Sequence, residues 1–253
     1  MADAIHGEEV ATIRFHENPF NLTELMTKDI NRNIPVILDI HTHHPAPRPE
    51  AVVCVRPDEF SPVEGQFYSV GIHPWLVAEG IPDSMWDALE QAAAHPQVVA
   101  IGECGIDLVK GGPLYKQMLV MKRQIELSEK IGKPLVIHCV HAHDIVIGVK
   151  KDLKPKQNWL IHGFRGKPTI AEMFISAGIS LSFGALFNEK SVSVVPEGML
   201  LAETDESDIS IEDIITRLST LTGRDLTSEI ACASASFLGM DGKNSEHQEH
   251  VTC

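Results

Sequence analysis

The chain has 253 residues, of which 43% are hydrophobic and 22% are charged. This length suits one large domain, and the apolar content is enough for a sizeable core, which excludes disorder as the dominant state. Asp and Glu outnumber Lys and Arg by 35 to 21, so the net charge is −14. Proteins that bind nucleic acid through its phosphates usually carry a basic surface. Nucleic-acid binding here would therefore need bound cations to reverse the sign of the charge locally.

The length of the apolar runs, the N-terminal residues and the cysteines limit where the protein is located and how its chain is divided into domains. No apolar run reaches the roughly 20 residues that span a bilayer, and residues 1–9 lack the basic start and apolar stretch of a secretory signal. The cysteines are widely spaced, without a C-x-x-C pair, which argues against a disulfide framework. We expect a cytoplasmic monomer without membrane contact, with an N-terminal extension (1–34), one domain (35–240) and a disordered polar tail (241–253).

Short β-rich apolar runs recur along the chain after residue 35. They lie at 36–40, 51–55, 68–72, 98–102, 134–137, 159–161, 179–183 and 199–202. Helical patterns lie between and after them, at 85–94, 113–131, 168–178, 211–221 and 226–238. Continuous apolar runs of this length are typical of strands buried on both faces of a parallel sheet. Strand–helix alternation repeated about eight times, with no G-x-G-x-x-G or P-loop after the first run, favours a single (β/α)8 TIM-type barrel over a doubly wound open sheet.

Polar side chains stand at the ends of most of these runs. They are His41, His43, His73, Glu103, His138, His162 and Asp205. In a barrel the carboxyl ends of the strands converge on one rim, where active sites are built. Histidine and carboxylate side chains suit a borderline divalent metal ion, and burying so many polar groups without a cation would be costly. The set therefore predicts a metal centre at the C-terminal strand ends.

Glu103 is the candidate for a ligand shared by two ions. Barrel hydrolases with two metals need a bridging anion, which is often a carbamylated lysine at the end of the fourth strand. No lysine ends an apolar run in this chain, and Glu103 stands at that position. A bridging glutamate is therefore the simpler model. His41 and His43 are two residues apart, so a strand would direct both side chains to the same face.

The motifs that contain these residues resemble those of the TatD family of metal-dependent deoxyribonucleases, which are amidohydrolase-like barrels. The motifs are H-T-H at 41–43, G-I-H-P at 71–74, G-E-C-G-I-D at 102–107, P-L-V-I-H at 134–138, H-G-F at 162–164 and E-T-D at 203–205. The resemblance runs from about residue 35 to residue 239. It implies that the metal ligands are His41, His43, Glu103, His138, His162 and Asp205. It also implies that His73 lies at the edge of the site and contacts the substrate.

The chain departs from the family pattern where relatives bind their substrate. Val140 and His141 stand where the family usually has Arg and Asp, and the loop after Asp205 is almost absent, so the chain is a shortened variant. Lys110 and Arg165 are candidate replacements for the missing phosphate contacts. The alternative for both is an ordinary solvated surface charge.

The resemblance implies a divalent-metal-dependent hydrolase of phosphoesters, a deoxyribonuclease that acts on short or single-stranded nucleic acid ends or on a small phosphoester. Two ions (Zn, Mn or Mg) would share Glu103, Asp205 would hold and deprotonate the attacking water, and His73 would orient the phosphate. Asp39 is expected to support a ligand imidazole. Two alternatives stay open: a barrel hydrolase of an amide, lactone or phosphotriester, and a metal-binding scaffold with weakened catalysis.

Overall fold

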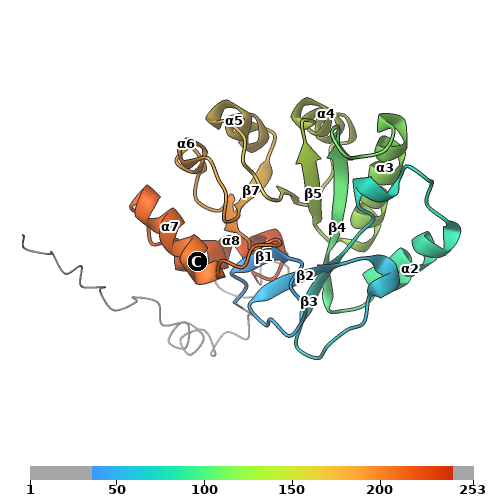
Figure 1. Cartoon of the computed structure of the whole chain (residues 1–253), viewed down its shortest axis with the longest axis horizontal. Coiled ribbons are helices and arrows are strands. Elements are labelled where there is room, and N and C mark those ends of the chain that lie inside the picture. Colours follow the sequence, from blue (N-terminus) through green and yellow to red (C-terminus); the bar gives the residue numbers. More distant parts are fainter. Residues whose placement is uncertain (1–35, 242–253) are drawn as a thin grey trace, which may run out of the picture.

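The computed structural model describes residues 36–241, so the expected extension 1–34 and residues 242–253 of the expected tail lie outside the described residues. Eight parallel strands are hydrogen-bonded in chain order, and the helices lie around them (Figure 1). The strands are β1 (Asp39–Thr42), β2 (Ala51–Val55), β3 (Phe67–Val70), β4 (Val98–Asp107), β5 (Leu135–Val140), β6 (Trp159–Ile161), β7 (Ile179–Phe183) and β8 (Leu200–Ala202). The TIM-type barrel that the sequence predicts is confirmed.

One α-helix lies in each connection from β3 to β8, and the last two α-helices follow β8. The helices are α2 (Asp83–Ala93), α3 (Leu114–Ile131), α4 (His143–Leu153), α5 (Pro168–Ser176), α6 (Glu189–Val192), α7 (Ile211–Thr222) and α8 (Leu226–Phe237), with short 3-10 helices η1 (Pro57–Glu59) and η2 (Pro74–Leu76). Gly132 ends α3 and Gly223 ends α7, each with a positive φ that an L side chain would adopt only with strain. Within residues 36–241, no helix is long and apolar enough to cross a membrane.

A short backbone bridge between β1 and the segment after β8 nearly closes the barrel. Thr42 and Asp205 form a parallel bridge. The Asp205 N–H donates a hydrogen bond to the His41 carbonyl (3.0 Å), and the His43 N–H donates to the Asp205 carbonyl (3.0 Å). This backbone pairing places two candidate ligands from β1 beside a third that follows β8.

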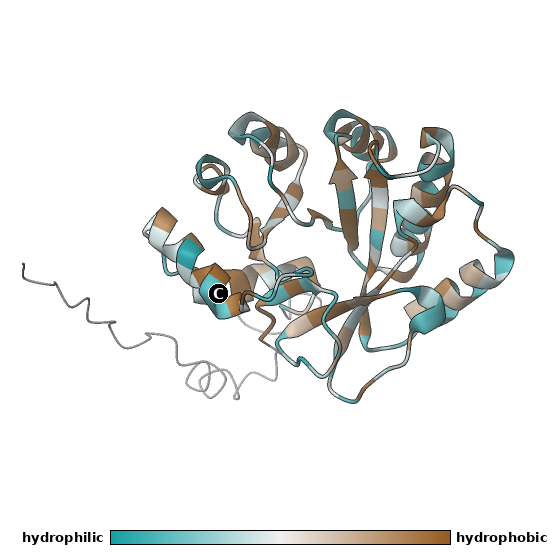
Figure 2. Cartoon of the chain, viewed as in Figure 1, coloured by the Kyte–Doolittle hydropathy of each residue, from teal (hydrophilic) through white to brown (hydrophobic). Residues whose placement is uncertain are grey.

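The apolar residues form two buried clusters. The larger one packs the strands against the surrounding helices and includes Phe174 of α5 and Phe183 of β7. The smaller one gathers side chains from several strands together with Phe237 of α8; its strand members include Val52, Ala100, Val136, Leu160 and Leu201. Figure 2 shows hydrophobic residues concentrated on the strands and polar residues on the outer turns of the helices. The barrel thus has the rigid core that a precise metal centre needs.

The structure differs from the sequence-based expectation at two kinds of place. The β1–β2 and β2–β3 connections contain no α-helix, since in the described chain the second holds only η1. The alternation expected throughout is therefore wrong at these two connections. Strand bounds also shift: β1 ends at Thr42 and β4 continues to Asp107, so His41 and Glu103 lie within strands and not just after them.

Candidate metal centre

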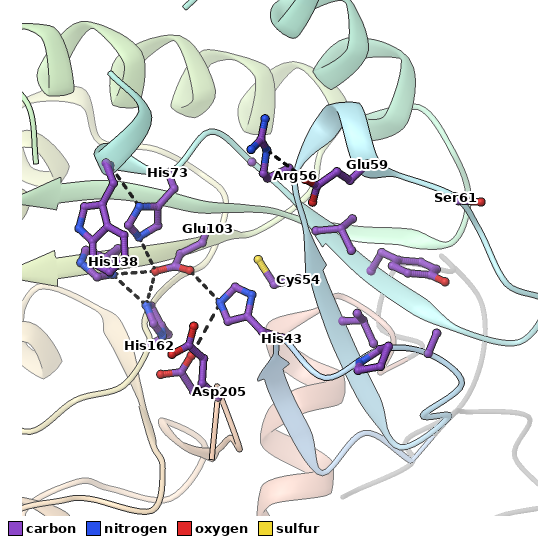
Figure 3. A pocket seen from close by; sticks show the side chains of 18 of the residues that line it. His43, Cys54, Arg56, Glu59, Ser61, His73, Glu103, His138, His162 and Asp205 are labelled. Carbon is purple, nitrogen blue, oxygen red and sulfur yellow. Dashed lines mark hydrogen bonds and ion pairs between the residues drawn. The ribbon is translucent and has the colours of Figure 1, made fainter. Parts of the chain in front are cut away.

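Glu103 on β4 lies at the centre of a histidine cluster at the C-terminal ends of the strands (Figure 3). Its Oε1 atom lies 2.7 Å from His138 Nδ1 and 2.7 Å from His162 Nε2. The same oxygen lies 3.1 Å from His73 Nε2. One oxygen of this carboxylate therefore faces three imidazole nitrogens that come from β5 and from the segments after β6 and β3.

The second oxygen of Glu103 faces the first strand. Oε2 lies 3.3 Å from His43 Nε2 and 3.6 Å from His41 Nε2. Asp205 Oδ1 adds a carboxylate oxygen to this group, 3.7 Å from His43 Nε2 and 3.9 Å from His41 Nε2. The Glu103 carboxylate thus lies between two groups of potential metal ligands, the arrangement that a bridging ligand requires.

The structure brings the six predicted metal ligands and His73 together in this cluster. His73 lies deeper than a position at the site edge implies, because its side chain is 20% exposed and its Nε2 is within hydrogen-bond distance of Glu103. Its ligand atom and those of Glu103 and His138 all lie within 4.8 Å of one another. His73 is therefore placed where it could contact a metal ion as well as a substrate.

The buried imidazole of His41 indicates that the cluster can bind a metal ion. Its side chain is fully buried, yet neither Nδ1 nor Nε2 has a hydrogen-bond partner in the described part of the chain. Buried polar atoms without a partner are rare in folded proteins, whereas a neutral imidazole nitrogen is a common metal ligand. Imidazole nitrogens together with carboxylate oxygens suit a borderline divalent ion such as Zn²⁺ or Mn²⁺. The residues present therefore fit a divalent metal.

The protonation states of Glu103 and His41 agree with metal binding. Burial by itself raises the pKa of Glu103, but the positive charge of His162 and hydrogen bonds to His138, His162 and His43 outweigh burial and hold this pKa well below its usual range. Burial, followed by the charge of His162, holds the pKa of the His41 imidazole well below its usual value. An ionised carboxylate and a neutral imidazole are the forms that bind metal ions. A hydrogen bond to Glu103 raises the pKa of His43, and at His162 burial is outweighed by the Glu103 charge, which raises the pKa as well, so a metal ion would displace a proton from these two imidazoles.

Two further buried carboxylates hold the histidines in place, and the sequence analysis assigned neither to the site. Asp107 Oδ2 lies 3.1 Å from His138 Nε2 and accepts a hydrogen bond from Trp75 Nε1 (2.7 Å). Glu203 Oε1 lies 3.6 Å from His162 Nδ1. Carboxylates on the outer nitrogen of a ligand histidine fix its tautomer and ring orientation. Both residues stand in motifs quoted above, so their position at the ends of apolar runs could have assigned them to the site.

We expect Asp107→Asn to weaken metal binding by about 10- to 100-fold. In the aspartate, Oδ1 accepts hydrogen bonds from the backbone N–H groups of Val109 and Lys110 (2.8 Å each), and Oδ2 faces His138. The amide has only one acceptor oxygen, so it cannot accept hydrogen bonds on both sides. Competition with a chelating dye measures the affinity. Asp144→Asn is the matched control, because Asp144 also pairs with a histidine but lies on α4, outside the cluster. Equal affinities of the two variants would contradict this role of Asp107.

Asp39 belongs to the closure of the barrel and not to the metal centre. Its carboxylate accepts hydrogen bonds from the Thr204 N–H (2.9 Å) and hydroxyl (2.7 Å), and Arg48 lies 3.8 Å away. Within the described residues it contacts no ligand imidazole. The expectation that Asp39 supports a ligand is therefore wrong, because its side chain turns toward the segment after β8.

A cavity of about 750 Å³ opens over the cluster and extends past β2 toward η1. Figure 3 shows Arg56 and Glu59 on the far side of this cavity from His138. Arg56 pairs with Asp58 (2.8 Å), so its charge is already compensated. Lys110 lies against Trp75, with Nζ 4.7 Å from the ring centroid. The cavity is thus wide enough for a substrate but carries little free positive charge.

The comparison with known families identifies the family of the chain. Residues 61–213 match the family model described as TatD related DNase. The chain belongs to this family. The matched region holds five of the cluster residues: His73, Glu103, His138, His162 and Asp205. The membership inferred from the motifs is confirmed.

Curated TatD relatives carry hydrolase and exonuclease names. The chain is 32% identical over 152 residues to the "Uncharacterized metal-dependent hydrolase TatD" of Mycobacterium tuberculosis, covering 55% of this chain and 57% of the relative. It is 29% identical over 147 residues to the "3'-5' ssDNA/RNA exonuclease TatD" of Erwinia billingiae, covering 54% of this chain and 56% of the relative. The matched region therefore spans little more than half the length of these relatives.

Solved TatD structures share the fold over a larger part of the chain. The TatD homologue YjjV of Escherichia coli superposes with a TM-score of 0.68 at 21% identity, covering 81% of this chain and 98% of that structure. A TatD family hydrolase of Entamoeba histolytica gives a TM-score of 0.63 at 14% identity, with the same coverage of 81% and 98%. At these identities the likeness concerns the barrel fold alone.

Proposed function

We propose that this TatD family chain is a metal-dependent phosphodiesterase that hydrolyses short or single-stranded nucleic acid ends. The observation that carries the proposal is the position of Glu103, whose two oxygens face separate groups of imidazole nitrogens. Two donor groups on either side of one carboxylate favour two divalent ions over one. The relatives named as an exonuclease and as a metal-dependent hydrolase support hydrolysis of a nucleic acid ester.

The donor groups divide the ligands between the two ions. His41, His43 and Asp205 would hold one ion, His138 and His162 would hold the other, and Glu103 would contact both. Bound divalent ions would lower the pKa of a water molecule and neutralise charge on the reacting phosphate. His73 would donate a hydrogen bond to a phosphate oxygen and so orient the ester for in-line attack.

Asp205 would accept the proton of the attacking water. Its side chain is 27% exposed and lines the cavity, so a substrate and a water molecule can reach it. Burial, followed by the nearby charge of Glu203, raises the pKa of Asp205 above its usual value. A carboxylate that is open to the cavity beside the ion-binding groups is in position to take this proton.

The decisive experiment measures metal content and substrate class on the same preparation. The full chain is stripped of metal and reconstituted with Zn²⁺, Mn²⁺ or Mg²⁺. It is then assayed on a short single strand, a duplex, an amide, a lactone and a phosphotriester. We expect two ions per chain and cleavage of phosphodiesters, lost on chelation and restored by metal. One ion per chain would contradict the bridging role, and turnover of an amide or lactone alone would contradict the nuclease assignment.

We expect the activity to depend only weakly on salt. Each contact between protein and phosphate adds roughly −0.7 to the logarithmic salt slope for a single strand. Lys110 and Arg165 are cations near the site without a paired acid among the described residues, on a chain of net charge −14. The slope of kcat/KM should therefore correspond to about one or two contacts, and a dinucleotide should be cleaved nearly as well as a long duplex. A steep slope with preference for long duplexes would contradict this view of the surface.

A further inference from the structure

Trp75 presents an exposed indole ring at the wall of the catalytic cavity. Of the three tryptophans in the chain, Trp86 and Trp159 are 7% and 1% exposed, whereas Trp75 is 48% exposed. Trp75 lines the same cavity as Glu103. An aromatic ring left exposed beside a polar site is typical of a binding surface, because its large apolar face gains most from contact with a ligand.

The indole is held in a fixed position relative to Glu103. Its Nε1 donates a hydrogen bond to Asp107 Oδ2 (2.7 Å), and its backbone N–H donates to His73 Nδ1 (3.1 Å). Its ring meets the His73 ring edge-to-face, with centroids 4.7 Å apart, and His73 Nε2 in turn lies 3.1 Å from Glu103 Oε1. The ring therefore lies within one nucleotide's reach of the candidate metal centre, and little entropy is lost in ordering it on binding.

Lys110 supplies a movable positive charge beside this ring. Its backbone N–H donates to Asp107 Oδ1 (2.8 Å), which fixes the start of the side chain, while Nζ lies 4.7 Å over the Trp75 ring centroid. Among residues 36–241, no carboxylate pairs with its ammonium group. A cation over an exposed ring is held more weakly than a stacked base, and the lysine side chain is flexible. A base could therefore displace the ammonium from the ring, leaving it free to contact a phosphate.

We propose that Trp75 and Lys110 form a nucleotide subsite, in which an unpaired nucleobase stacks on the indole and Lys110 Nζ contacts an adjoining phosphate. This proposal rests on the proposed phosphodiesterase function and describes how that substrate is bound. Stacking tolerates any base, because every base has a π-face. A base inside a duplex is already stacked on its neighbours, so this subsite selects strand ends and single strands. It also explains how a chain of net charge −14 could hold nucleic acid with few cations.

The kinetic test compares the dinucleotide TpT with two analogues in which one or the other thymine is replaced by an abasic sugar. We expect the wild-type kcat/KM to fall by about tenfold or more on one analogue. Trp75→Ala should lose this difference, and Trp75→Phe should retain part of it because a phenyl ring also stacks. Lys110→Ala should keep the difference but reduce the salt slope. Equal rates on all three substrates, or an undiminished difference in Trp75→Ala, would overturn the subsite.

Trp86→Phe is the matched control for the tryptophan variants. Trp86 also carries a cation over its ring, since Arg123 Cζ lies 4.0 Å from the centroid, but it lies on α2 and does not line the catalytic cavity. We expect this variant to keep the full difference between TpT and its abasic analogue. Loss of the difference in Trp86→Phe would overturn the assignment to Trp75, because stacking would then not be local to the cavity.

A fluorescence titration tests the subsite without any turnover. Thymidine 5′-monophosphate should quench the emission of the metal-loaded wild type, and 2-deoxyribose 5-phosphate, which lacks the base, should not. Trp75→Phe should show no quenching, because the remaining tryptophans are buried. A chain that cleaves no phosphodiester would contradict the proposed function, and quenching at Trp75 would still support the subsite. Cleavage without quenching would overturn the subsite and leave the proposed function standing.

Discussion

Replacing Glu103 by Gln is expected to lower bound metal and activity together, with kcat/KM falling by about a hundredfold or more. The amide keeps the size of the side chain but removes its charge and one acceptor oxygen. It can therefore face the His41–His43 group or the His138–His162 group as a ligand, but not both. Elemental analysis of the purified variant and kcat/KM on a short single strand measure the two losses.

Stability offers a second measurement of the same change. A ligand that binds only the folded state raises the free energy of unfolding by mass action, so the metal-loaded wild type should melt above the metal-free protein. In Glu103→Gln this difference should shrink. Glu90→Gln is the control, because Glu90 is a half-exposed carboxylate that pairs with Arg123 (3.6 Å) on the outside of the barrel. Unchanged metal content in Glu103→Gln would contradict the bridging role.

Asp205→Asn is expected to reduce turnover far more than metal occupancy. Asparagine keeps an oxygen beside His43 and His41 but cannot accept a proton, and general-base catalysis contributes at least about a hundredfold. The substitution should leave the backbone intact, because residue 205 has a φ of 54°, and Asn is among the few residues besides Gly that adopt this conformation readily. A stability loss is therefore not expected to obscure the kinetic effect.

The measurement for Asp205→Asn pairs single-turnover rates with metal titration on one sample. We expect the rate of the chemical step to fall by about a hundredfold or more while the two ions stay bound at saturating metal. Turnover within about threefold of the wild type would exclude Asp205 as the proton acceptor. A parallel loss of metal and rate would instead assign it a purely ligating role.

Local patterns in the sequence were sufficient to predict the barrel. Buried parallel strands read as short apolar runs, such as 98–102 and 159–161, because both of their faces are covered. Glycine and proline mark the helix ends, as Gly132 and Gly223 do for α3 and α7. The same patterns could not predict that the first two connections lack α-helices. A loop and a helix can both satisfy the backbone hydrogen bonds of these segments, and packing around β1 and β2 decides between them.

The residues that form the candidate metal centre were also predictable, because parallel strands in a barrel bring their carboxyl ends together whatever their separation in sequence. Histidine or carboxylate after an apolar run therefore identifies a rim residue, as for His138 and His162. This argument concerns the direction of the backbone only. It cannot say which side chain contacts which, and on that point the expectation for Asp39 was wrong.

Tertiary structure alone decided the contacts between side chains. Glu103 faces two groups of imidazoles, one from β1 and the other from β5 and the segment after β6, and the direction of each carboxylate oxygen follows from packing. Asp39 turns to Thr204 because the barrel closes there, and Asp107 joins Trp75 to His138 across three segments. The sequence thus determined which chemical groups reach the rim, through local periodicity. Their mutual orientation depends on long-range packing, which no local pattern encodes.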